Sequence, residues 1–414
     1  AGLQLEWVAR DELLGFPALR GPLRETVRWN GQDCQVERDF AQEQRWLEQI
    51  WDRCPLLPRE TELILAELDP ALDLLEQLRA ASVPLEWSEG KEWKVRPAAT
   101  SQSLTVSAQK GEGEWFEVAG SLRLDESKVL AMSRALELAR TYPGRYVQLE
   151  GGDFLRLDQR LREQLNALEQ VLEPHGKTFR LSTLALPALE DIELGELHSD
   201  QHYHTVLERF RETARIRAPI PRTLQAELRD YQEVGFRWLA QRAELGAGAC
   251  LADDMGLGKT IQVLALMIQE QDKGPHLVVC PTSVTGHWVD QVRQFCPTLE
   301  PVLYQGPRRR PLLESLGPGQ VVITSYSLLR QDQRQLGNLA WHIGLLDEAL
   351  TIKYPHSQTA RACFSLKARI RLATTGTPIE NRLLQLWSLF HFLNPGLLGS
   401  QASFEKRFDN VPGA

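Results

Sequence analysis

The chain has 414 residues, of which 43% are hydrophobic and 25% are charged. This composition is typical of a globular protein of two or three domains. No apolar run approaches the ~18 residues that span a bilayer, and the N-terminal residues show no basic region followed by an apolar stretch. We therefore exclude a membrane-spanning class, expect no membrane partner, and predict a cytoplasmic protein.

The net charge of −8 argues against a uniformly basic nucleic-acid binder. The charge is uneven, because residues 1–221 carry 27 basic and 38 acidic side chains, whereas residues 222–414 carry 20 basic and 17 acidic ones. Any phosphate-contacting surface is therefore expected in the second half. The six cysteines form no C-x-x-C pair, which favours buried, reduced thiols over disulfides or zinc ligands.

The spacing of apolar residues divides the chain into four regions. Residues 1–100 are predicted to be a mainly helical accessory region, because apolar side chains between Phe40 and Trp51 recur at helical spacing. Residues 101–200 are predicted to be an α+β accessory region, since alternation begins at Leu104 and two short strands flank Gly151–Gly152. Residues 201–221 are predicted to be a linker helix and a proline-containing linker, and residues 222–414 form the fourth region, which carries the motifs described below.

The segment 253–260, with the sequence DDMGLGKT, lies between a predicted buried strand and a predicted helix. A strand, a glycine-bearing loop and a helix N-terminus together form a phosphate cradle, in which backbone N–H groups and the helix dipole attract anions. Lys259 is placed to reach the β and γ phosphates of ATP, and the Thr260 hydroxyl to bind Mg²⁺. The predicted nucleotide-binding residues of this segment are Asp254, Met255, Gly256, Leu257, Gly258, Lys259, Thr260 and the following Ile261.

From residue 228 onward the chain resembles the SWI/SNF-type ATPases of helicase superfamily two, in their bacterial form. The motifs appear in family order between residues 222 and 408: LRDYQEVGFRWL at 228–239, the phosphate loop, PTSVTGHW at 281–288, VVITSYSL at 321–328, IGLLDEAL at 343–350 and ATTGTPIEN at 373–381. The resemblance implies an α/β fold, with a RecA-like P-loop lobe that has a largely parallel sheet and follows the α+β accessory region. It also implies that ATP and Mg²⁺ are bound and that Gln232 contacts the adenine edge.

Within this resemblance, Lys259, Asp347 and Glu348 are the predicted catalytic residues. Asp347 and Glu348 follow an apolar run at the end of a predicted strand, where ligands gather in open α/β sheets. Asp347 would hold Mg²⁺ through water, together with Thr260. Glu348 would act as the general base for the attacking water.

The predicted nucleic-acid contacts are hydroxyl side chains that follow two of the strands, Thr282 and Ser283 after one and Thr324 and Ser325 after the other. Helix capping is the alternative role for each of them. The cluster 306–310, which contains three adjacent arginines, is predicted to be a solvated loop, with a DNA backbone contact as the alternative. Trp288 is predicted to be a packing anchor.

Two positions depart from the family pattern. Leu350 stands where the family has glutamine or histidine, and Tyr354 stands where it has asparagine. Because leucine cannot form a hydrogen bond to a γ-phosphate, these departures predict weaker coupling of hydrolysis to movement. The sequence also ends after one lobe, so a second ATPase lobe, which would supply arginine fingers, is expected beyond residue 414, and this fragment is expected to hydrolyse ATP poorly.

The resemblance predicts the ATP-binding portion of a DNA-dependent ATP hydrolase. The intact protein would move along double-stranded DNA and remodel or displace DNA-bound proteins. Two alternatives are a nucleotide-sensing interaction module without motor activity, and an RNA-directed helicase of the same superfamily.

Overall fold

The computed structural model of the chain describes residues 3–6, 8–10, 15–17, 21–29, 32–60, 62–87, 92–125, 128–150, 152–379 and 382–408. The chain divides into two compact units that alternate along the sequence. Unit 1 comprises Ala1–Val106, Ala119–Gln170 and Ile192–His198, and unit 2 comprises Ser107–Val118, Val171–Asp191 and Ser199–Ala414. Within the described ranges, no helix is long and apolar enough to cross a membrane.

The first hundred residues contain short strands as well as two helices. The helices are α1 (Phe40–Arg53) and α2 (Leu68–Ala80), and the strands are β1 (Leu3–Glu6), β2 (Val8–Arg10), β3 (Gly15–Pro17), β4 (Arg24–Trp29), β5 (Gln32–Glu37), β6 (Glu62–Leu65) and β7 (Val95–Ala99). The prediction of a mainly helical region is therefore wrong. Strands β4 and β5 pair antiparallel, and the sequence between them, Asn30–Gly31, is a hairpin signal. Strands of three to six residues are too short for alternation to stand out beside helical spacing.

The next hundred residues contain both helices and strands, as predicted for an α+β region. The helices are α3 (Met132–Thr141), α4 (Gln159–Val171) and α5 (Leu186–Glu190), and the strands are β8 (Leu104–Lys110), β9 (Trp115–Arg123), β10 (Val129–Ala131), β11 (Tyr146–Gln148), β12 (Phe154–Leu157), β13 (Glu173–His175), β14 (Thr178–Ser182) and β15 (Glu196–Ser199). The predicted hairpin is confirmed, because β11 and β12 pair antiparallel. Helix α6 (Gln201–Arg215) follows, and Asp200 caps its N-terminus because the Asp200 carboxylate accepts a hydrogen bond from the Tyr203 amide.

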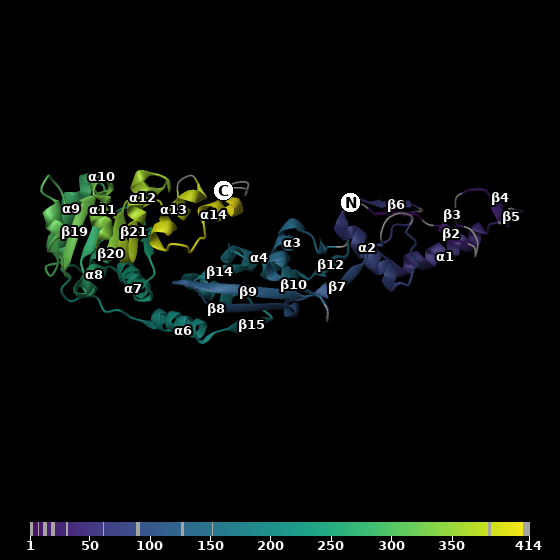
Figure 1. Cartoon of the computed structure of the whole chain (residues 1–414), viewed down its shortest axis with the longest axis horizontal. Helices are drawn as coiled ribbons and strands as arrows, with labels where there is room; N and C mark the ends of the chain where they lie inside the picture. Colours follow the sequence, from purple (N-terminus) through teal and green to yellow (C-terminus); the bar gives the residue numbers. More distant parts are fainter. Residues whose placement is uncertain are drawn as a thin grey trace. The chain divides into compact units, whose positions relative to one another are not determined.

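A six-stranded parallel sheet forms the centre of unit 2, with the strand order β16-β21-β20-β17-β19-β18. The strands are β16 (Ala249–Leu251), β17 (His276–Cys280), β18 (Glu300–Leu303), β19 (Gln320–Ser325), β20 (Ala340–Asp347) and β21 (Lys367–Thr374). The helices are α7 (Asp230–Leu245), α8 (Lys259–Gln269), α9 (Thr285–Phe295), α10 (Tyr326–Gln331), α11 (Gln333–Asn338), α12 (Gln358–Phe364), α13 (Leu383–Leu393) and α14 (Gln401–Phe408). The prediction of an α/β lobe with a largely parallel sheet is confirmed (Figure 1).

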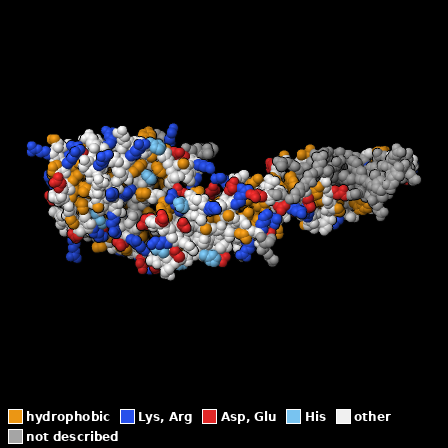
Figure 2. Space-filling model, in the orientation of Figure 1, with side chains coloured by type: hydrophobic (Ala, Val, Ile, Leu, Met, Phe, Trp, Pro, Cys, Tyr) orange, Lys and Arg blue, Asp and Glu red, His pale blue; other side chains and the backbone are white. Residues whose placement is uncertain are grey.

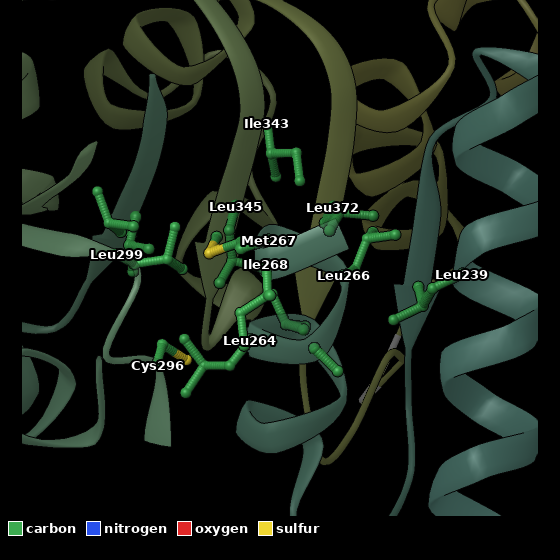
Figure 3. Packing of buried hydrophobic residues seen from close by; sticks show 14 of the residues in the cluster. Leu239, Leu264, Leu266, Met267, Ile268, Cys296, Leu299, Ile343, Leu345 and Leu372 are labelled. Atoms are coloured by element: carbon green, nitrogen blue, oxygen red, sulfur yellow. The ribbon is translucent and has the colours of Figure 1, made fainter. Parts of the chain in front are cut away.

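Helices cover both faces of this sheet, which explains why its strands are continuous apolar runs. Val278 and Cys280 of β17 pack with α7, α8 and α9 on one face, whereas Leu277 and Val279 pack with α10, α12 and α13 on the other. Figure 3 shows the first of these layers, where α8 side chains such as Leu264 lie against the sheet. Burial of each such leucine contributes about 1.5–3 kcal/mol.

Candidate nucleotide and nucleic-acid site

The candidate site lies at the carboxyl edge of the parallel sheet. Leu251, Thr374 and Asp347 are aligned across the neighbouring strands β16, β21 and β20. The phosphate loop follows Leu251, and the carboxylates Asp347 and Glu348 end β20. Because neighbouring strands lie ~4.8 Å apart, the two groups are separated by roughly 10 Å at the same edge. The structure thus brings together the two elements that the sequence predicted as a catalytic pair.

The phosphate loop has an open backbone surface that suits a phosphate chain. Gly256 and Gly258 have φ angles of +86° and +74°, which favour glycine. A Cβ placed on Gly256 would meet no atom within 4 Å, so nothing covers the loop there. Helix α8 begins directly after Gly258, and its first N–H groups therefore border the loop.

Lys259 points back into the loop. Its ammonium group donates hydrogen bonds to the carbonyl oxygens of Asp253 at 2.7 Å and Asp254 at 3.1 Å. An ammonium group held by carbonyl dipoles can exchange these partners for phosphate oxygens, which bind it more strongly. In this structure the ammonium group therefore lies within the loop that the sequence predicts to hold phosphates.

Gln232 supports the phosphate loop from the start of α7. Its amide nitrogen donates to the carbonyl of Leu257 at 3.0 Å, and its amide oxygen accepts from the Arg229 backbone at 3.0 Å. The Tyr231 hydroxyl donates to the same Leu257 carbonyl at 3.1 Å. Gln232 is buried, so an adenine contact would require it to exchange one of these hydrogen bonds.

Asp347 is held by side chains from three other elements. The Thr374 hydroxyl donates to Oδ1 at 2.6 Å, the Trp288 indole N–H donates to Oδ2 at 2.8 Å, and the Tyr326 hydroxyl donates to the backbone carbonyl of Asp347 at 2.8 Å. The Glu348 backbone N–H adds a bond to Oδ1 at 3.1 Å. These contacts set the direction of the carboxylate in this structure, and that direction depends on the positions of the elements that carry the donors.

Glu348 has a strained backbone at the end of β20. Its φ angle is +52°, and among the described non-glycine residues only Ser82 shares a positive φ. Such strain costs of order 1 kcal/mol or more and gathers at functional sites. The turn leaves the Glu348 side chain exposed beside Asp347, where a general base must reach water.

The first hydroxyl loop contains Thr282 and Ser283, and the second hydroxyl loop contains Thr324 and Ser325. These two predicted nucleic-acid loops meet at a pocket of about 180 Å³. Its lining is mixed and includes the apolar side chains Leu303 and Leu328 as well as hydroxyl-bearing residues, namely Thr282, Thr285, Ser325 and Ser327. Ser283 is exposed beside Thr282. Ser325 also caps α10, because its hydroxyl accepts a hydrogen bond from the Leu328 amide at 3.3 Å. The structure therefore shows the capping role for Ser325, whose side chain is 2% exposed, and its phosphate contact stays a prediction.

Thr324 makes an internal hydrogen bond in this structure. Its side chain is fully buried, and its hydroxyl lies 3.4 Å from the Tyr304 carbonyl oxygen, to which it donates. The neighbouring Ser325 is buried as well, with 2% of its surface exposed, so burial does not separate the two residues. The phosphate contact of Thr324 stays a prediction.

The arginine cluster is anchored rather than fully solvated. Arg309 and Arg310 both donate to the carboxylate of Asp332, at 2.6 Å and 2.8 Å for their closest nitrogens. The Tyr304 hydroxyl donates to the same carboxylate at 3.0 Å. Arg308 is exposed at the tip of the loop.

Comparison with known proteins assigns the second half of the chain. Residues 231–412 match the family model described as the SNF2-related domain. Residues 231–412 form an SNF2-related domain. The phosphate loop, the Asp347–Glu348 pair and both hydroxyl loops lie within it.

Relatives of this SNF2-related domain occur in bacteria and eukaryotes. The chain is 36% identical over 282 residues to YwqA of Bacillus subtilis, which is named as an ATP-dependent helicase/translocase, and the match covers 62% of this chain and 30% of YwqA. It is 40% identical over 208 residues to Helicase ssl-1 of Caenorhabditis elegans, with 48% of this chain and 9% of ssl-1 covered. The chain therefore spans about a third or less of the length of these relatives.

Part of the chain is also similar to a solved structure. The solved SWI2/SNF2 ATPase core of Sulfolobus solfataricus in complex with double-stranded DNA is 38% identical, with a TM-score of 0.43. That match covers 47% of this chain and 41% of the solved chain.

Sequence reasoning missed the hydrogen-bonding roles of Trp288 and Tyr326 in the SNF2-related domain. Trp288 is buried, as a packing anchor should be, yet its indole N–H also orients Asp347. A signal existed, because a buried tryptophan or tyrosine usually finds a partner for its polar atom. The partner could not be named from spacing. Glu380 and Asn381 of the last motif lie outside the described residues.

Proposed function

We propose that this chain is the ATP-binding portion of an ATP-dependent translocase on double-stranded DNA, which moves or displaces DNA-bound proteins. The observation that carries the proposal is the shared sheet edge of the Lys259 loop and the Asp347–Glu348 pair, separated by a single strand within an SNF2-related domain. The proposal includes a cytoplasmic location and a second ATPase lobe as partner in the intact protein.

In this mechanism each side chain has a distinct role. Lys259 would exchange the carbonyls of its own loop for the β and γ phosphates. Thr260 and Asp347 would hold Mg²⁺, which would neutralise charge that develops on the phosphates. One carboxylate with one hydroxyl suits Mg²⁺, because this ion takes few protein ligands and completes its shell with water and phosphate. Glu348 orients the attacking water and accepts its proton.

A nucleic-acid contact on the same lobe is supported by chemistry and charge. Thr282 and Ser283 are exposed, and Ser325 opens onto the same pocket as Thr282, so hydroxyls from two loops can meet one phosphate chain. Residues 222–414 carry three more basic than acidic side chains. Figure 2 shows several lysine and arginine side chains along the margin of the lobe where Figure 1 labels α10.

The test is ATP hydrolysis by the full protein with and without double-stranded DNA. We expect stimulation by DNA, weaker nucleotide binding in Lys259→Ala, and a rate about 10²–10⁴-fold lower in Glu348→Gln, which should still bind ATP. Absence of stimulation by duplex DNA would rule out the motor. Stimulation by duplex RNA alone would assign an RNA-directed helicase instead.

A nucleotide-sensing module without motor activity is the second candidate. Leu350, which follows the catalytic pair by two residues, supports it. An apolar side chain there cannot form the hydrogen bond to the γ-phosphate that would couple hydrolysis to movement, although nucleotide could still bind. This candidate predicts ATP binding by the full protein with no effect of DNA on hydrolysis.

A further inference from the structure

Trp288 connects the first hydroxyl loop to the catalytic carboxylate. It lies in the first turn of α9, which begins two residues after Ser283. The side chain is 2% exposed, and its indole N–H donates to Oδ2 of Asp347 at 2.8 Å. A short backbone segment and one rigid ring therefore join a loop proposed to contact nucleic acid with the proposed Mg²⁺ ligand.

Tyr326 makes the corresponding connection from the second loop. It directly follows Ser325, is 7% exposed, and donates its hydroxyl to the carbonyl of Asp347 at 2.8 Å. Because Tyr326 is the first residue of α10, its hydrogen bond to Asp347 depends on the position of the start of that helix.

The two rings reach Asp347 from opposite faces of the sheet. Trp288 belongs to the core layer with α7 and α8, and Tyr326 belongs to the layer with α12 and α13. A shift of either helix start by about 1 Å would lengthen a 2.8 Å hydrogen bond beyond its effective range. Packed cores resist gradual deformation, so such a shift would act as a discrete change at Asp347.

We infer that Trp288 and Tyr326 are positioning residues that couple nucleic-acid contact at the two hydroxyl loops to the orientation of Asp347. The inference rests on the proposed function and adds the route by which DNA would stimulate hydrolysis. DNA bound at the loops fixes the starts of α9 and α10, and the two donors then hold the carboxylate in its metal-binding direction. Both residues act through their hydrogen bonds to Asp347.

The experiment compares matched substitutions in the full protein. Tyr326→Phe removes one oxygen atom, and Trp288→Phe removes the indole N–H. The control for Trp288 is Trp341→Phe, which removes an indole N–H that donates to the Leu336 carbonyl at 2.9 Å in the same lobe. The control for Tyr326 is Tyr146→Phe, which removes a buried hydroxyl that donates to carboxylates in unit 1.

The readouts are the ratio of kcat with DNA to kcat without DNA, and the Mg²⁺ concentration that gives half the maximal rate with DNA. A lost hydrogen bond to a charged group predicts about a tenfold lower ratio for Trp288→Phe, and a lost bond to a neutral carbonyl predicts about a threefold lower ratio for Tyr326→Phe. Both variants should need more Mg²⁺. The two control variants should keep the wild-type ratio and the wild-type Mg²⁺ requirement.

The outcomes separate the inference from the proposed function. A wild-type protein that DNA does not stimulate overturns the proposed function, and the inference with it. A stimulated wild type whose Trp288→Phe and Tyr326→Phe variants match their controls overturns the inference alone. If Trp288→Phe lowers the Tm far more than Trp341→Phe does, the result for Tyr326→Phe decides on the inference, because phenylalanine keeps the shape of the tyrosine ring.

Discussion

The ammonium nitrogen of Lys259 lies 2.7 Å from the carbonyl oxygen of Asp253, inside the loop that would hold the phosphates. We expect Lys259→Ala to weaken ATP binding about 10–100-fold, because one hydrogen bond from a charged group contributes about 1.5–3 kcal/mol. Isothermal titration of the chain with ATP and Mg²⁺ measures the change. Lys273→Ala is the control, since Lys273 pairs with Glu270 away from the loop. Equal affinities for the two variants would contradict the assigned role.

We expect the protein to lose stability when the buried carboxylate of Asp332 is replaced by a neutral side chain. Its side chain is fully buried between Arg309, which is 17% exposed, and Arg310, which is 60% exposed. Burial would raise the pKa of Asp332, but hydrogen bonds from both arginines and Tyr304 outweigh it and hold the pKa below its ordinary value. We expect Asp332→Asn to lower the free energy of unfolding by about 2 kcal/mol, less than the ~3–5 kcal/mol typical of fully buried pairs.

Urea denaturation of the chain at neutral pH measures this difference. The control is Asp272→Asn, an exposed carboxylate in the same lobe, which should change the free energy by less than ~0.5 kcal/mol. Because the pKa of Asp332 is depressed in the folded state, its contribution is complete above the unfolded-state pKa and disappears as the pH falls through the folded-state pKa. Two variants of equal stability at pH 7 would show that the network contributes nothing.

His276 predicts a second pH dependence, at milder acidity. Its side chain is fully buried, its Nε2 lies 3.2 Å from the Met267 carbonyl, and its Nδ1 has no hydrogen-bond partner in the described structure. Burial, with a smaller effect of the neighbouring His342, lowers the pKa of His276 from 6.5 to about 4. Between these two values the unfolded chain binds the proton and the folded chain does not, so stability is complete above pH 6.5 and falls as the pH drops toward 4.

This histidine should account for up to about 3 kcal/mol of the loss across that window, at 1.36 kcal/mol per pH unit. Denaturation midpoints measured from pH 7 to pH 4.5 test the slope. His276→Gln should flatten the dependence of stability on pH. His287→Gln, a change at an exposed histidine, should leave that dependence unchanged. An identical slope in all three proteins would assign the acid sensitivity to other groups, such as the Glu270–His342 pair, whose closest atoms are 2.7 Å apart.

The parallel sheet could be predicted from sequence because its strands carry their own pattern. Residues such as Leu277–Val279 and Ile343–Leu346 are apolar at every position, which fits strands buried on both faces. The phosphate loop and the Asp347–Glu348 pair were predictable because each is a short local motif. The first hundred residues were not, because their short strands lack a period long enough to detect.

The contacts that join the motifs could not be predicted in the same way. Trp288 and Asp347 are 59 residues apart, and Arg310 and Asp332 are 22 apart. No local pattern links such pairs, since their meeting depends on the strand order of the folded sheet.

Leu350 gives the last prediction, which concerns coupling. It is partly buried in the turn after Glu348 and has no atom that can donate or accept a hydrogen bond. Leu350→Gln should raise the DNA-stimulated kcat of the full protein about two- to tenfold, the value of one added neutral hydrogen bond, without changing the KM for ATP. Leu350→Met is the control, because it keeps an apolar side chain of similar volume. If glutamine and methionine give the same rate, the leucine does not limit coupling, and the departure from the family pattern is then compensated elsewhere in the protein.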